Sequence, residues 1–176
     1  KNMNQLKYQL RYALPVWFCM LITSWLPDNR IGIKIRGFLV ALFLPNRPKN
    51  FTLGRDVTLL GIDKLTIGNN VYFAKGTWIN ALGGVTIEDE IMFGPYVVLV
   101  STKHTMKNNS VYQGNSEFKN VFIGKGTWIA SHCTITSGIS IGKGCIIAAN
   151  SVISKDIDDY LLVGGVPARV IKDLNE

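Results

Sequence analysis

The sequence is poor in the residues that usually bind metals. Only two histidines and three cysteines occur among its 176 residues. The cysteines, Cys19, Cys133 and Cys145, have none of the paired spacings that are typical of zinc sites. Two histidines are also too few for a three-histidine catalytic zinc site. We therefore expect no bound metal, and three buried free thiols rather than a structural disulfide.

Long apolar runs are absent as well. A membrane-spanning helix needs about twenty apolar residues, but the run over residues 12–27 contains Pro15 and the run over residues 31–45 contains Lys34 and Arg36. We expect two short helices here, which either lie on a membrane surface or only cap the core. No signal peptide is recognisable. The expected location is the cytoplasm, with peripheral contact at the inner face of the membrane.

Acidic residues are nearly missing from the first fifty positions. Residues 1–50 carry eight Lys and Arg and only Asp28, a net charge of 8 − 1 = +7. Residues 51–176 carry eleven basic and eleven acidic residues, so their net charge is zero. No nucleic-acid-binding motif accompanies the basic residues, and we expect no nucleic-acid partner. The chain is predicted to divide into a basic, helical segment over residues 1–50 and a neutral domain over residues 51–176, and the basic segment suggests contact with anionic lipid.

The domain over residues 51–176 has an apolar residue at every sixth position. The series is Ile67, Phe73 and Ile79, then Ile87, Phe93 and Leu99, then Ile123, Ile129, Ile135, Ile141, Ile147 and Ile153. A period of six fits neither a helix nor a plain strand, but it fits three short strands per turn of a solenoid. We predict an all-β, three-faced parallel solenoid of roughly five turns, whose stacked inward residues form the core. A glycine or small residue after each apolar position is expected to make the bend at each corner.

The repeat breaks off just before His104. This histidine follows Leu99 by five residues and begins a polar, protruding loop over residues 102–120. Long loops in compact domains are usually functional, and a histidine that titrates near neutral pH is suited to taking a proton from a hydroxyl group. His104 is therefore the candidate general base. His132, within the regular repeat, is expected to have a structural or interface role.

Three features together resemble the hexapeptide-repeat acyltransferase family. They are the hexads, the loop that begins with His104, and the stretches "GTWIAS" (126–131) and "GGVPARVIK" (164–172). The similarity covers about residues 51–174 and is greatest to maltose and galactoside O-acetyltransferases. It implies a left-handed β-helix, a homotrimer and acetyl-CoA as the acetyl donor. Residues 1–50 look more like those of polysaccharide O-acetyltransferases. The implied reaction is O-acetylation of a sugar in a cell-surface polysaccharide (O-antigen, capsule or exopolysaccharide), in free or lipid-linked form.

The resemblance also assigns residues to acetyl-CoA, with His104 matching the catalytic histidine. The expected contacts are Trp128, Ser131, Ala149, Ser154, Lys155, Arg169 and Lys172. Trp128 is expected along the pantetheine arm, and the basic side chains of Arg169 and Lys172 at the phosphates. Two alternatives stay open: Trp128 packs against a neighbouring subunit, and Lys172 belongs to a solvated tail over residues 159–176.

The acceptor site departs from the family pattern. Galactoside enzymes hold the acceptor with an asparagine thirty residues before the histidine, and this chain has Ala74 there. Asn80 and Lys75 are tentative substitutes. Two other functions remain open, an N-acyltransferase acting on an amino-sugar nucleotide and a non-catalytic scaffold. A carbonic anhydrase of the same fold is excluded because it needs three histidines.

Overall fold

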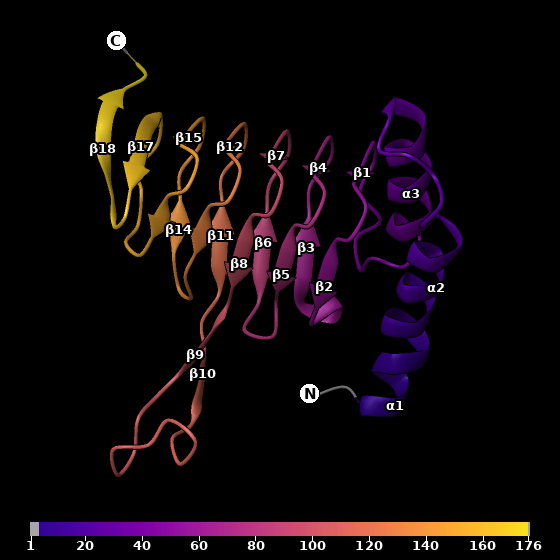
Figure 1. The fold of residues 1–176 in the computed structure, drawn as a ribbon, viewed down its shortest axis with the longest axis horizontal. Helices are drawn as coiled ribbons and strands as arrows, with labels where there is room; N and C mark the ends of the chain where they lie inside the picture. The colour runs from indigo at the N-terminus through magenta and orange to yellow at the C-terminus, as the bar shows by residue number, and fades with distance from the viewer. Residues whose placement is uncertain (1–3, 176) are drawn as a thin grey trace.

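The computed structural model describes residues 4–175, which form a parallel β-solenoid with helices at one end (Figure 1). Face A contains β1 (Thr52–Leu53), β4 (Tyr72–Phe73), β7 (Met92–Phe93), β12 (Trp128–Ile129), β15 (Ile146–Ile147) and β17 (Leu161–Gly165), with β18 (Ala168–Asp173) antiparallel to β17. Face B contains β2 (Thr58–Leu60), β5 (Trp78–Asn80), β8 (Val98–Val100), β13 (Thr134–Ile135) and β16 (Val152–Ile153). Face C contains β3 (Leu65–Ile67), β6 (Val85–Ile87), β11 (Val121–Ile123) and β14 (Ser140–Ile141).

Each turn gives one strand to each face, so the solenoid has three sides and three edges. We name the edges after the faces that they join: A–B, B–C and C–A. The predicted solenoid is confirmed, with about six turns rather than roughly five. The additional strand on face A is β17, which lies with β18 inside the predicted tail 159–176. The left-handed twist of the coil stays a prediction of the family resemblance.

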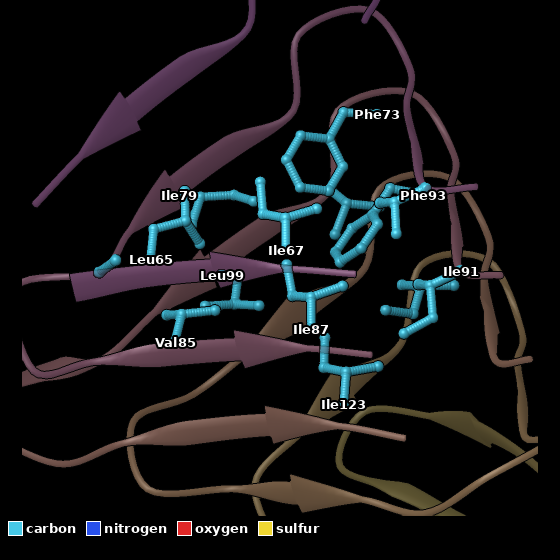
Figure 2. Close-up of a cluster of buried hydrophobic side chains, with 14 of the residues drawn as sticks. Leu65, Ile67, Phe73, Ile79, Val85, Ile87, Ile91, Phe93, Leu99 and Ile123 are labelled. Atoms are coloured by element: carbon cyan, nitrogen blue, oxygen red, sulfur yellow. The ribbon is translucent and has the colours of Figure 1, made fainter. Parts of the chain in front are cut away.

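The hexad residues point inward and form a continuous core (Figure 2). Phe73 stacks edge-on against Phe51 and Phe93, with ring centroids 5.3 and 4.8 Å apart. Parallel pairing puts equivalent residues in register, so that Ile67 lies beside Ile87 and Ile87 beside Ile123. Each such side chain contributes about 1.5–3 kcal/mol when it is fully buried. The period of six therefore builds a core that no single turn contains.

The glycines that follow the inward residues have a different role from the predicted one. At Gly54, a Cβ atom would lie 2.5 Å from the Lys75 backbone nitrogen of the next turn, and the φ angle of Gly54 is not positive. The left-handed conformation occurs two residues later, for example at Gly76 (φ 70°) and Tyr96 (φ 58°). The glycine thus permits close stacking between turns, and the bend itself is made two residues further along.

The helices cover the first turn of the solenoid (Figure 1). A continuous helical stretch consists of α1 (Gln5–Tyr8), the π-helical η1 (Gln9–Ala13) and α2 (Leu14–Ile22), and a second helix, α3, spans Arg30–Ala41. The wide π turn ends at Ala13, two residues before Pro15, which has no N–H group to continue the α-helical bonding. Asn29 caps α3 by accepting hydrogen bonds from the backbone of Ile31 and Gly32. Within residues 4–175, no helix is long and apolar enough to cross a membrane.

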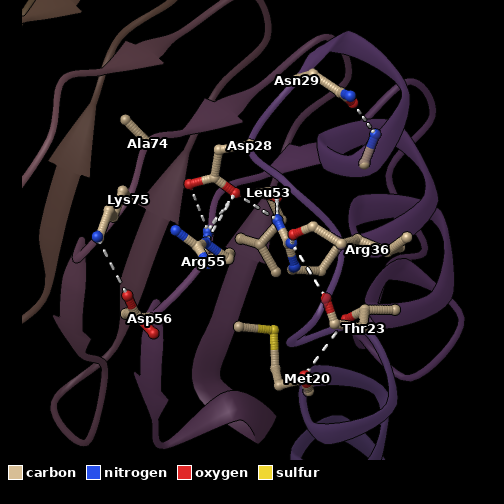
Figure 3. A network of polar contacts seen from close by, with 12 residues as sticks. Met20, Thr23, Asp28, Asn29, Arg36, Leu53, Arg55, Asp56, Ala74 and Lys75 are labelled. Carbon is tan, nitrogen blue, oxygen red and sulfur yellow. Dashed lines mark hydrogen bonds and ion pairs between the residues drawn. The ribbon is translucent and has the colours of Figure 1, made fainter.

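A buried arginine joins the helices to the solenoid (Figure 3). Arg36 is fully buried, and its Nη1 atom donates to Asp28 Oδ1 at 3.0 Å and to the Leu53 carbonyl at 2.8 Å. Its Nη2 atom donates to the carbonyls of Thr23 and Leu26 at 3.3 and 3.0 Å. Arg36 is therefore a structural cation, although the sequence alone grouped it with the other basic residues of the first fifty positions.

The three cysteines are buried and free, as predicted. Burial raises the pKa of the Cys19, Cys133 and Cys145 thiols, because the low-dielectric surroundings disfavour the thiolate. All three therefore act as small apolar groups.

Candidate active site

A two-stranded hairpin leaves the solenoid at the B–C edge between β8 and β11. Its strands are β9 (Thr102–His104) and β10 (Ser116–Phe118), which pair antiparallel, and the hairpin projects well away from the coil (Figure 1). The segment over residues 102–120, predicted as a loop, thus contains regular structure. The pairing places Ser116 directly opposite His104.

His104 is exposed on this hairpin, and its nearest polar partner is Ser116. The Ser116 hydroxyl oxygen lies 3.4 Å from His104 Nδ1. When Nδ1–H donates to this hydroxyl, the Nε2 lone pair is free to accept a proton from another group. Sequence analysis missed Ser116, since the antiparallel register that brings it to His104 requires strands that the polar composition of the loop does not indicate.

Asn80 anchors the root of the same hairpin. Its Nδ2 amide donates to Thr102 Oγ1 at 3.1 Å, and its Oδ1 atom accepts from the Leu82 backbone at 3.1 Å. Lys75 lies instead at the A–B edge, where its ammonium is 3.7 Å from Asp56. Ala74 is only 3% exposed, so it offers no surface to an acceptor. Of the two tentative acceptor residues, Asn80 is therefore the one that neighbours His104 within one chain.

Trp128 and Lys172 lie on the outer side of face A. Trp128 is 48% exposed and pairs with Ile146, which pairs with Leu162, which in turn pairs with Lys172. These four residues form a row across adjacent strands, apolar at one end and cationic at the other. Arg169 is exposed in the same strand, opposite Gly164. This row fits a ligand with an apolar arm and anionic phosphates.

The remaining predicted residues lie at two edges. Ser131 and Ala149 each stand two residues after a paired strand residue, Ile129 and Ile147, and so occupy the A–B edge in successive turns. Ser154 and Lys155 are exposed at the B–C edge, directly after Ile153. That is the edge from which the His104 hairpin departs, two turns away.

One chain does not bring all of these residues together. In a three-sided solenoid the B–C edge lies opposite face A, so the body of the molecule separates His104 from Trp128. A site that contains both residues requires two copies of the chain.

His132 makes a structural contact at the A–B edge. Its ring stacks on that of Tyr96, with centroids 5.2 Å apart and an interplanar angle of 21°. Its backbone has a φ of 59° and donates to the Pro95 carbonyl. These contacts agree with the structural role predicted for this histidine. No group of three or more metal-binding side chains occurs in the part of the chain that the structure describes.

Comparison with known proteins shows what this chain is similar to. The family model "Bacterial transferase hexapeptide (six repeats)" matches residues 120–155. The galactoside O-acetyltransferase of Escherichia coli (strain K12) is 34% identical over 110 residues, which cover 62% of this chain and 54% of that protein. The chain is thus similar to hexapeptide-repeat acetyltransferases in its repeat and in part of its sequence. The resemblance predicted from the sequence is thereby confirmed.

Solved structures of two acetyltransferases share the fold. A maltose O-acetyltransferase from Clostridium difficile 630 gives a TM-score of 0.82 at 22% identity, over 98% of this chain and 90% of that chain. A hexapeptide-repeat acetyltransferase from Vibrio cholerae O1 biovar eltor, complexed with acetyl coenzyme A, gives 0.73 at 19% identity, over 100% and 93%. The chain spans about half the length of the curated relatives that it matches.

Proposed function

We propose that this protein is an acetyl-CoA-dependent O-acetyltransferase that acetylates a hydroxyl group of a sugar, with His104 as the general base. The observation that carries the proposal is an exposed histidine on the hairpin that interrupts a hexapeptide repeat similar to that of sugar O-acetyltransferases. The relative with 34% identity is a galactoside O-acetyltransferase. The row from Trp128 to Lys172 suits an acyl donor with an apolar arm and phosphates.

The chemistry needs one proton carrier and one activated acyl group. Acetyl-CoA supplies the acetyl group as a thioester. His104 Nε2 takes the proton from the sugar hydroxyl while the hydroxyl oxygen bonds to the acetyl carbonyl carbon. As the carbon–sulfur bond breaks, the imidazolium returns this proton to the leaving thiolate. Ser116 acts as a positioning residue that holds the imidazole by its Nδ1 atom.

The proposed acceptor is a sugar unit of a cell-surface polysaccharide, either free or attached to a lipid carrier. Ala74, in the place of the asparagine of galactoside enzymes, makes the pocket different from theirs. Asn80 is 9% exposed and both of its amide atoms are hydrogen-bonded, so it would support the sugar site indirectly, by holding the strand that carries His104. Lys75 would contribute from the A–B edge of a neighbouring copy.

A cyclic homotrimer is the proposed assembly. It would set the B–C edge of one copy against the A–B edge and face A of the next, which joins His104 to Trp128 and Ser131. All three interfaces would then be equivalent, and each would hold one site.

The histidine pair provides a matched test of the reaction. Thiol release from acetyl-CoA is measured with galactosides, maltose, polysaccharide fragments and an amino-sugar nucleotide. His104→Ala is expected to lower turnover about 10²–10⁴-fold, the usual contribution of a general base, whereas His132→Ala should retain turnover. Unchanged turnover in His104→Ala would falsify the base assignment. A wild-type enzyme inert towards every acceptor would support the scaffold, and preference for the amino sugar would support N-acylation.

Mixing two inactive variants tests the shared site. His104→Ala and Trp128→Ala are co-expressed, so that hybrid assemblies form. If each site takes one residue from each of two copies, about a quarter of the sites in random hybrids contain both native residues. Activity should then return to about that fraction. Absence of recovery in hybrids of confirmed trimeric mass contradicts the shared site.

A further inference from the structure

The helical stretch α1–η1–α2 has an exposed apolar stripe along its whole length. On the helix the stripe consists of Leu6, Leu10, Leu14, Trp17, Phe18, Leu21 and Ile22, all at least 43% exposed, and the exposed Trp25 lies in the turn after α2. They recur at intervals of three and four residues, so they share one side of the helix. The opposite side, with Tyr12, Val16 and Cys19, packs in the core. The helix is therefore apolar on both sides, and only one side has a partner.

The helix α3 repeats this arrangement. Ile31, Ile35, Phe38 and Leu42 form an exposed stripe, while Val40 and Ala41 belong to the same core as the buried side of α2. Since both buried sides face one core, both stripes turn away from the solenoid. Exposed apolar surface of this extent in a soluble domain marks a binding surface. We call the two stripes together the apolar cap.

A basic groove continues the apolar cap at its α3 end. A cavity of about 470 Å³ is lined by Phe38, Leu42 and Phe51 and by three cationic side chains, Lys34, Arg47 and Lys49. Phe38 and Leu42 belong to both the groove and the stripe. The groove thus offers cations directly beside an apolar surface, the combination that an anionic lipid headgroup and its acyl chains require.

The charge of this end of the molecule is unbalanced. Asp28 is the only acidic residue in positions 1–50, and it is already paired with the buried Arg36. Lys7, Arg11 and Arg30 are exposed, as are Lys34, Arg47 and Lys49, and none of these six forms an ion pair within residues 4–175. A second copy docked through the same surface would bring like charges together. A bilayer with anionic headgroups would neutralise them.

We propose that the apolar cap and the basic groove bind the surface of an anionic lipid bilayer, with the helices lying in the plane of the membrane. The sequence left open whether these helices touch a membrane or cap the core, and the structure shows that one side caps the core while the other is free for lipid. The proposed binding is peripheral, and no helix among residues 4–175 is long and apolar enough to cross a bilayer. The inference does not depend on acetyl transfer.

The experiment is vesicle flotation of the full chain. Vesicles of phosphatidylcholine alone are compared with vesicles of equal parts phosphatidylcholine and phosphatidylglycerol. Wild type should float only with the anionic vesicles, and less at high salt because ions screen the headgroups. The charge variant Lys34→Glu/Lys49→Glu should weaken binding by at least about tenfold. Its matched control, Lys107→Glu/Lys143→Glu, makes the same charge change at exposed lysines away from the helices and should bind like wild type.

A second pair of variants tests the apolar part. Phe18→Ser/Phe38→Ser removes two exposed aromatic rings of the apolar cap, and Phe118→Ser/Tyr112→Ser removes two exposed rings of the hairpin. Only the first pair should lose vesicle binding, and circular dichroism should show that both remain folded. Absence of wild-type binding to anionic vesicles overturns the proposal. If wild type does not bind vesicles and Phe18→Ser/Phe38→Ser also has a lower oligomer mass, the proposal is likewise overturned. The surface would then be an interface between copies.

Discussion

The helical segment and the solenoid are both rich in apolar residues but use them in opposite ways. In the solenoid, Phe73, Phe93 and their equivalents point inward and are completely buried. In the helices, an apolar core-facing side is matched by an apolar side that faces outward, where Phe38 is 65% exposed. A fold needs only one buried side per element. The exposed apolar side chains of the helices exceed what folding requires, which fits a binding surface. The inward side chains of the solenoid are needed for its core.

Removing one aromatic ring from each region gives the largest expected difference. Phe93→Ala should lower the free energy of unfolding by about 4 kcal/mol, because it leaves a cavity between stacked turns. Phe38→Ala should change it by less than about 0.5 kcal/mol, since its ring is largely in solvent. Urea unfolding of both variants measures the contrast. Equal losses would show that Phe38 is covered in the assembled protein.

Arg36 tests how firmly the two regions are joined. Arg36→Met should cost about 3 kcal/mol, because it leaves the carbonyl groups of Leu53 and Leu26 without their donor and Asp28 with Arg55 alone as partner. The control Arg30→Met changes an exposed arginine and should be nearly neutral. Thermal unfolding followed by circular dichroism gives both values. A mild effect of Arg36→Met would mean that packing alone holds the helices on the first turn.

Replacing glycines at the corners of the solenoid should change the free energy of unfolding least. Gly54→Ala should cost about 2 kcal/mol, because its Cβ would meet the backbone of the next turn. Gly126→Ala should cost about 1 kcal/mol, since its φ of 75° disfavours a side chain although nothing lies within 4 Å. Denaturant midpoints of the two variants rank them. If Gly126→Ala is the more destabilising change, the positive φ of the bend, rather than close stacking between turns, is the main reason for glycine at these corners.

The candidate site was predictable only in part. His104 and the row that includes Trp128 stand at recognisable positions in the repeat, so their residue numbers follow from spacing and family resemblance. The role of Ser116 could not be predicted in this way. It lies twelve residues after His104 in a polar segment, and only the antiparallel pairing of the hairpin brings the two side chains together. Asn80 and Lys75 were equivalent in the sequence, and only the assignment of edges separates them.

By itself, the sequence determined the solenoid, its faces and its inward residues, since a period of six has one geometric solution that buries every apolar position. It also determined that positive charge gathers at one end. Tertiary structure alone decided that Arg36 is buried, that Ser116 meets His104, and that His104 and Trp128 lie on opposite sides of one chain. These facts depend on contacts between distant segments, which local periodicity does not specify.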